Sequence, residues 1–263
     1  MKLKIAIGLV LTLLLILAVT LFLAASKPRN GPYPSPNAVE TLSLASKQMT
    51  PLPLDFDTTD DVTALKAYLD SNTEPLTLID QAMDQESLFP LDKMESPDES
   101  LELTQTVRGP FRLLVAKARV AELEKRYDDA IETYLQMCTL SDKSARGGLL
   151  INCMVATACK GIAFDGLSRV AGHLSKEQRI EVERVAEAAA IDSIDRDAML
   201  ERERQYSKRF NGVFVTWQMG KLQAQTVNES LQTNASNQRR MAEQLLETLG
   251  DQSVSPNTKP NDS

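Results

Sequence analysis

An apolar run near the N-terminus constrains this chain more than any other feature. Residues 5–25 contain no charged side chain. A helix of that length is about 30 Å long, which matches the hydrocarbon thickness of a bilayer. Lys2 and Lys4 precede the run and provide the positive flank that is typical of membrane-targeting segments. The sequence therefore predicts a chain that is tied to a membrane or sent across one.

The run has two interpretations, a retained anchor and a cleaved signal peptide. It is longer than the apolar region of most signal peptides, and the best cleavage site follows Ser26. Lys27 and Pro28 come directly after that site and disfavour cleavage. We therefore expect residues 1–26 to form a transmembrane signal-anchor, with cleavage after Ser26 as the alternative. A slight positive-inside bias favours a single-pass protein whose N-terminus is cytoplasmic and whose body lies outside the cytoplasm.

The rest of the chain is acidic. All 36 Asp and Glu lie after residue 29, together with 25 of the 29 Lys and Arg, which gives this part a net charge of −11. An acidic surface repels nucleic acid, and aromatic residues make up only 5% of the chain, too few for base stacking. We expect no nucleic-acid partner and no cofactor.

Composition and periodicity divide the chain beyond the anchor into three parts. Residues 27–57 are interrupted by prolines and predict a stalk or linker, with a short helix over 37–49. Residues 58–249 place apolar side chains at three- and four-residue steps and show almost no period-two alternation, so they predict an all-α domain. Residues 250–263 have the composition of a disordered tail.

Several local signals predict where helices begin, bend or end. Ser175 and Gln178 have the spacing of a capping box at a helix start. Gly109-Pro110 predicts an interruption, Lys160-Gly161 a break, and Asn211-Gly212 a kink or break in a long charged helix. The stretch 149–174 is apolar on most faces, which is typical of a buried helix and disfavours a second membrane span.

The segment Tyr127–Tyr134 resembles the second helix of a tetratricopeptide repeat. In that register Ala130 stands at the small position of the second helix and Ala118 at the small position of the first, while Leu114 and Tyr134 stand at the large apolar and aromatic positions. The resemblance implies a helical hairpin over 109–142 whose helices touch at these alanines. It further implies a concave surface that binds peptides or proteins.

The sequence departs from the repeat pattern of this family at several positions. Four positions carry an unusual residue for their place, namely Lys117, Ala121, Met137 and Asp142. A weaker second copy extends to residue 174, with Gly166-Leu167 in register with Ala130-Ile131. An ordinary antiparallel hairpin that uses alanine at its contact is the alternative interpretation.

The cysteines do not form a disulfide framework, because three is an odd and small number. One interpretation takes Cys138, Cys153 and Cys159 as small buried apolar residues. The other joins Cys138 to Cys153 or Cys159 by a disulfide between neighbouring helices. Cys153 and Cys159 are six residues apart on one helix, so they point in different directions and do not pair.

The chain offers little that predicts catalysis or metal binding. His173 is the sole histidine and has no partners at metal-ligand spacing, so a structural role is expected. The acidic clusters Asp128-Asp129 and Asp192 to Asp197 fit helix caps and solvated faces better than a catalytic pair. Asn228 and Asn234 begin N-glycosylation sequons, which matter only in a glycosylating secretory pathway.

Three functions remain as hypotheses from the sequence. The first is a membrane-anchored scaffold that binds another protein, or itself, through a helical groove. The second is an extracytoplasmic enzyme with a carboxylate-based site. The third is a structural or oligomerising envelope component that self-associates through residues 176–249, although this segment lacks a sustained heptad seam.

Overall fold

The computed structural model describes residues 33–51, 60–190 and 196–254. All regular secondary structure in these ranges is helical, so the predicted all-α class is confirmed there. The N-terminal run predicted as a membrane anchor lies outside the described residues. The helices are α2 (Ala38–Gln48), α3 (Val62–Asp70), α4 (Thr73–Asp84), α5 (Pro97–Leu123), α6 (Tyr127–Ala145), α7 (Leu150–Val170), the short 3₁₀ helix η1 (Ala171–His173), α8 (Lys176–Ala190) and α9 (Arg196–Val254).

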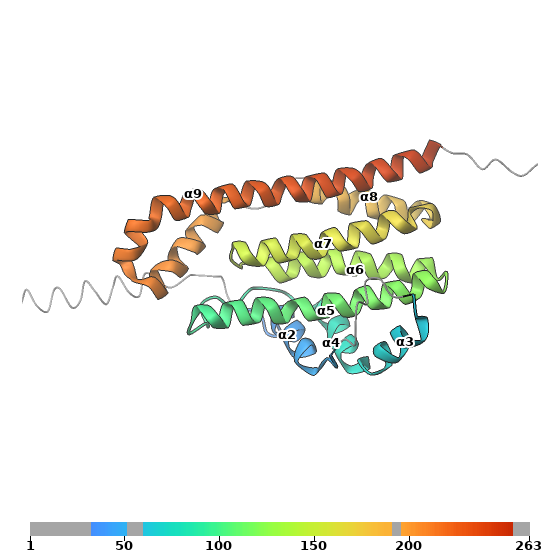
Figure 1. The fold of residues 1–263 in the computed structure, drawn as a ribbon, viewed down its shortest axis with the longest axis horizontal. Helices are drawn as coiled ribbons and strands as arrows, with labels where there is room; N and C mark the ends of the chain where they lie inside the picture. The colour runs from blue at the N-terminus through green and yellow to red at the C-terminus, as the bar shows by residue number, and fades with distance from the viewer. Residues whose placement is uncertain (1–32, 52–59, 191–195, 255–263) are drawn as a thin grey trace, which may run out of the picture.

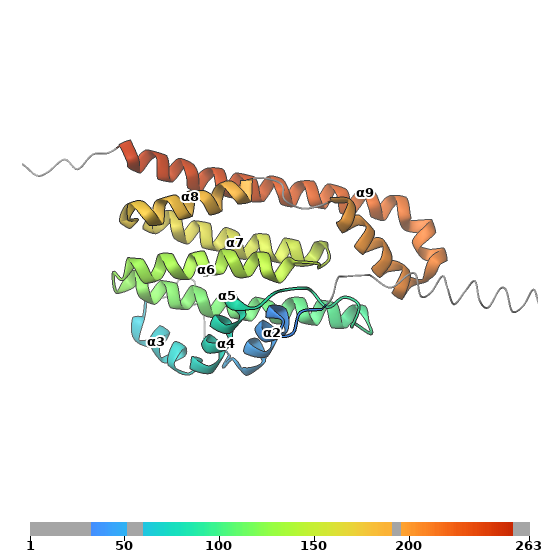
Figure 2. The same cartoon turned by 180° about the vertical axis from the view of Figure 1, so that it is seen from behind.

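The helices stack in successive layers around an antiparallel trio. Helices α5, α6 and α7 run back and forth through the middle of the body (Figures 1 and 2). Helices α2, α3 and α4 cover the outer side of α5, while on the opposite side α9 packs on α7 and α8 packs on α9. One continuous apolar core joins α2 at one end of the stack to the C-terminal part of α9 at the other.

Helix α2 is part of this body, although its residues fall in the range predicted as a stalk. The amide oxygen of Asn37 caps the helix by accepting from the N–H of Val39 at 3.1 Å, and its Nδ2 donates to the carbonyl of Leu88 at 2.8 Å. Ala38 and Leu42 have no exposed surface. The short helix expected over 37–49 is confirmed, and the packed body begins upstream of residue 58.

The predicted interruption at Gly109-Pro110 is wrong, because α5 continues through both residues. A proline within a helix removes one backbone hydrogen bond, but Pro110 is buried. A Cβ on Gly109 would overlap the side chain of Ser46 on α2. The glycine therefore permits the close approach of α2, and this packing outweighs the local helix-breaking tendency.

Helices α5 and α6 form the hairpin that was predicted around Ala118 and Ala130. The turn between them contains Lys125 in the left-handed region at φ 60°, and the N–H of Arg126 donates to the carbonyl of Ala121 at 2.8 Å. Ala118 and Ala130 have no exposed surface. This burial is the environment that small residues at a close helix contact require.

Helices α6 and α7 meet where Tyr134 packs on Gly166. The tyrosine ring is fully buried, and a Cβ on Gly166 would overlap it. The phenol hydroxyl donates to Glu122 Oε1 at 2.5 Å, and Arg169 Nη2 donates to the phenol oxygen at 2.9 Å. Burial, reinforced by the Glu122 carboxylate, raises the pKa of Tyr134, so the phenol keeps its proton. One side chain thus joins α5, α6 and α7.

Helix α7 continues through Lys160-Gly161, so the predicted break there is wrong. Lys160 is only 6% exposed and pairs with Asp142 of α6 at 2.6 Å, while Gly161 lies against Met241 of α9. Both residues serve contacts between helices. Because α7 is one helix, the helix pair of a second repeat copy does not occur at the predicted register.

Among the described helices, the stretch Leu150–His173 is the one long and apolar enough to cross a membrane. Within it, 56% of the most apolar window is buried inside the body. It packs between α6 and α9, and Asn152 at its start is buried and donates to Thr104 Oγ1 at 2.8 Å. We interpret α7 as a core helix, in line with its sequence.

Helix α9 folds back on itself in its N-terminal half (Figure 1). Met199 and Leu231 belong to one buried cluster together with Cys153 of α7. In a straight helix these two residues would lie about 48 Å apart at 1.5 Å per residue, so the helix must bend between them. The bend falls in the range where Asn211-Gly212 predicted a kink. The capping box at Ser175 and Gln178 is also confirmed by both of its hydrogen bonds.

The Tyr134–Gly166 contact generates a stability prediction. Gly166→Ala introduces a Cβ into the space of the tyrosine ring, so we expect the free energy of unfolding to fall by about 1–3 kcal/mol. Urea unfolding of the detergent-solubilised full chain, followed by circular dichroism, measures the loss. Gly250→Ala is the matched control, because a Cβ there meets no atom within 4 Å. Equal midpoints for the wild type and Gly166→Ala would contradict the close contact.

Candidate functional site

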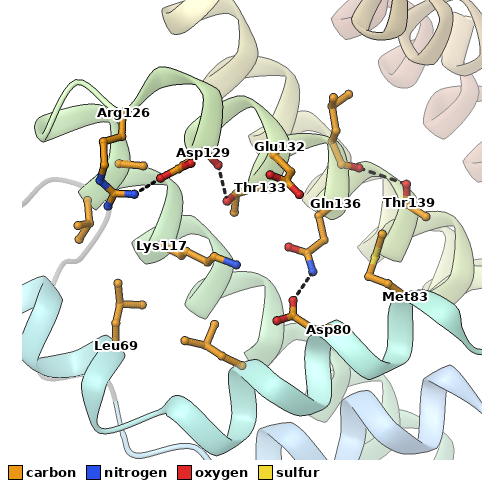
Figure 3. A pocket seen from close by; sticks show the side chains of 14 residues that line it. Leu69, Asp80, Met83, Lys117, Arg126, Asp129, Glu132, Thr133, Gln136 and Thr139 are labelled. Carbon is orange, nitrogen blue, oxygen red and sulfur yellow. Dashed lines mark hydrogen bonds and ion pairs between the residues drawn. The ribbon is translucent and has the colours of Figure 1, made fainter. Parts of the chain in front are cut away.

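A groove of about 840 Å³ lies between α4 and the α5–α6 hairpin (Figure 3). Helix α3 contributes Leu69 at one end of it, and α4 forms one wall through Leu76, Asp80 and Met83. The opposite wall and the floor come from α5 and α6. The lining residues are Leu69, Leu76, Asp80, Met83, Lys117, Val120, Ala121, Arg126, Asp129, Glu132, Thr133, Leu135, Gln136 and Thr139.

Part of the groove is lined by apolar side chains that are only half-buried. Leu69, Leu76, Met83 and Leu135 are half-buried and pack with one side against the core. The other side of each borders the groove. Partly exposed aliphatic and methionine side chains in a concave surface are the usual means of holding the apolar side chains of a peptide or protein.

Charged groups of both signs occupy the rim. Gln136 Nε2 donates to Asp80 Oδ1 at 2.9 Å, which links α6 to α4, and Arg126 forms ion pairs with Asp129 and Glu124. Lys117 extends across the space between the walls (Figure 3). Among the described residues, neither Lys117 nor Glu132 has a hydrogen-bond or ion-pair partner. The groove therefore presents one unpaired cation and one unpaired anion beside an apolar lining.

The wall formed by α4 is held in place by a lysine from α6. The ammonium of Lys143 donates to the carbonyls of Met83, at 2.6 Å, and of Gln85. These carbonyls stand at the C-terminal end of α4, where backbone acceptors lack helical partners and the helix dipole favours a cation. Lys143 therefore ties the end of α4 to the hairpin.

The groove holds three carboxylates, the residue type predicted for the enzymatic alternative. Asp129 is engaged by Arg126, and Asp80 accepts from Gln136. Glu132 lies on the same helix as Asp129, one turn away. A general acid–base pair needs two carboxyl groups that face one reacting atom. Two of these three are instead bound to neighbouring side chains, Asp80 by Gln136 and Asp129 by Arg126.

His173 lies outside the groove. Its ring stacks on Tyr127, with 3.5 Å between the centroids and 4° between the planes. Asp128 accepts from Gln178 Nε2 at 2.9 Å, so this part of the acidic pair joins α6 to α8. Of the second cluster, Asp197 is described, exposed in the first turn of α9. Within the described ranges, no cluster of His, Cys, Asp and Glu could hold a metal ion.

All three cysteines are free and buried in the structure, and neither of the two alternative disulfides is formed. Cys138 lies on α6, and Cys153 and Cys159 lie on α7. Burial raises the pKa of each thiol, to about 12 for Cys138. A thiol with a raised pKa holds little thiolate and reacts slowly.

One of the two sequons is incompatible with the packing. Asn234 is buried and its Nδ2 donates to Thr157 Oγ1 at 3.0 Å, which joins α9 to α7. A glycan on that nitrogen would separate the two helices. Asn228 is half-buried on the same helix.

Comparisons with protein-family models, with curated proteins and with solved structures each found no match to the chain. Sequence reasoning anticipated the α5 and α6 helices of the groove but did not anticipate its second wall. Met83, Asp80 and Leu76 come from α4, and no local signal in the sequence relates this helix to residues that follow it by about 40 to 60 positions.

The state of the thiols is testable by alkylation. In the folded protein we expect brief iodoacetamide treatment to leave Cys138, Cys153 and Cys159 unmodified, because burial suppresses the thiolate. Unfolding without a reductant should then expose three alkylation sites, counted by intact mass. A mass that reports a single alkylated cysteine until a reductant is added would show that a disulfide exists after all.

Proposed function

We propose that this protein is a membrane-anchored interaction protein that holds a segment of a partner protein in the groove between α4 and the α5–α6 hairpin. In this proposal the apolar run 5–25 is the anchor and the helical body is the binding module. The observation that carries it is the groove lining, in which half-buried apolar side chains lie beside the unpaired ammonium of Lys117.

The chemistry of the groove defines the segment it suits. Leu69, Leu76, Met83 and Leu135 favour aliphatic or aromatic side chains, which bury apolar area on binding. Lys117 favours an acidic side chain at the middle of the segment, and Glu132 favours a basic one close by. An amphipathic segment with apolar anchors and both charges on its edge meets these requirements.

The resemblance of the α5–α6 hairpin to a tetratricopeptide repeat supports the same proposal. That family uses helical hairpins to bind peptides and proteins rather than to catalyse reactions. Here the supporting contacts are the buried alanines Ala118 and Ala130 and the fully buried aromatic ring of Tyr134. The long helix α9 packs on α7 and α8 of its own body. This packing leaves less helix surface for self-association through residues 176–249, which the hypothesis of an oligomerising envelope component requires.

Site-specific photo-crosslinking in the native cell tests the proposal. A photoreactive amino acid at Thr139, which is exposed at the groove, should give an adduct of one defined mass. The same amino acid at Glu187, which is exposed on α8, should not give it. Equal adducts from both positions, or none from Thr139, would contradict binding in the groove.

Charge reversal gives the corresponding energetic test. Lys117→Glu should reduce the Thr139 adduct and weaken the purified partner's binding by about 1–2 kcal/mol, roughly a tenfold rise in Kd. Lys47→Glu is the matched control, because Lys47 is an exposed lysine on α2 outside the groove. Calorimetry with both variants measures the difference. An unchanged Kd for Lys117→Glu would show that Lys117 does not contribute to partner binding.

A further inference from the structure

A second surface lies on α7, on a side that no described helix covers. Ile151, Met154, Ala158 and Ile162 follow one another at three- and four-residue steps, so they share one side of the helix. All four are exposed, with 40%, 44% and 49% of the surface of Ile151, Met154 and Ile162 accessible. We call these four residues the α7 face. Exposed aliphatic residues clustered on one side of a helix mark a contact surface.

The neighbouring part of α5 extends this surface. Thr104 of α5 accepts from Asn152 of α7, which places the two helices side by side at this level. Leu101, one turn before Thr104, is 48% exposed. Arg108, one turn after it, is exposed and lies close to Cys159 of α7.

The charge of the α7 face differs from that of the whole body. The first carboxylate on this side of α7 is Asp165, beyond the last residue of the face. Arg108 has no ion-pair or hydrogen-bond partner among the described residues. An apolar stripe with a free guanidinium at its edge suits the interface of a bilayer, where apolar side chains enter the acyl region and cations meet phosphate groups. The whole chain beyond residue 29 carries a net charge of −11, so the rest of the body is acidic and is repelled by anionic lipid.

The chain enters the body at the end where the α7 face begins. Tyr33, the first described residue, donates its hydroxyl to the carbonyl of Leu88 at 3.0 Å. The next residue, Phe89, donates its N–H to the carbonyl of Arg146 at 2.8 Å, and α7 begins four residues later at Leu150. Residues 27–32 separate Tyr33 from the predicted anchor, and the seven Cα–Cα steps from residue 26 to Tyr33 span at most about 25 Å. A bilayer that holds the anchor is therefore within reach of this end.

We propose that the α7 face, together with Leu101 and Arg108, rests on the lipid surface of the bilayer that holds the N-terminal anchor. This inference rests on the membrane anchoring in the proposed function. It assigns the body an orientation, with the open side of α7 against the lipid.

Fluorescence quenching in reconstituted vesicles tests this orientation. The full chain is inserted into vesicles of equimolar phosphatidylcholine and phosphatidylglycerol, with and without brominated acyl chains. An environment-sensitive fluorophore is attached through Met154→Cys or Ile162→Cys. Ile180→Cys on α8 is the matched control, since Ile180 is also a strongly exposed isoleucine, at 58%. The native cysteines are buried, so brief labelling selects the introduced one.

We expect brominated lipid to remove at least half of the fluorescence of a probe at position 154 or 162. The fluorescence of the probe at position 180 should stay unchanged. Arg108→Gln should reduce the quenching at both face positions. If the chain floats with the vesicles but the face positions are quenched no more than position 180, the orientation is wrong while the anchor stands. If the chain does not float, both the anchor and the orientation fail. Blue-shifted emission without quenching would overturn the lipid contact, because it would mean that a second copy of the chain covers the face.

Discussion

The contact between the ring of Tyr134 and the backbone of Gly166 sets the spacing of the central helices. Because glycine has no side chain, α7 can approach α6 until the ring lies on its backbone. The hydroxyl then reaches Glu122 of α5 and receives a hydrogen bond from Arg169 of α7. Both hydrogen bonds are partly buried, so leaving the phenol hydroxyl without these partners would be costly. The outer helices pack on this trio, and their positions follow from its geometry.

Helix α5 separates the two proposed surfaces, the groove and the α7 face. Lys117 in the groove and Arg108 beside the α7 face are nine residues apart on α5, which places them on opposite sides of that helix. A body that rests on lipid through α7 would therefore turn its groove away from the bilayer. In that arrangement one helix supports both the orientation of the body and its access to a partner.

The polar side chains that organise the body act mostly over long distances in the sequence. Lys143 caps the carbonyls at the end of α4, and Glu203 of α9 accepts from the N–H of Leu150 at the start of α7 at 2.7 Å. Burial raises the pKa of Glu203, while this hydrogen bond and Arg202 oppose that effect. Each of these residues satisfies a helix terminus that its own neighbours leave open. Such pairings depend on the packed arrangement, and no pattern in the local sequence contains them.

The sequence by itself determined the features that depend on neighbouring residues. The all-α class, the capping box at Ser175, the helix after Asn37 and the small residues of the α5–α6 hairpin follow from local periodicity, capping chemistry and side-chain size. Tertiary structure decided the cases in which packing competes with local preference. Gly109-Pro110 and Lys160-Gly161 look like helix breaks, but close contact with α2 and α9 keeps both helices continuous. The groove and the α7 face also belong to the tertiary structure, because each is made by residues that only the packing of distant helices brings together.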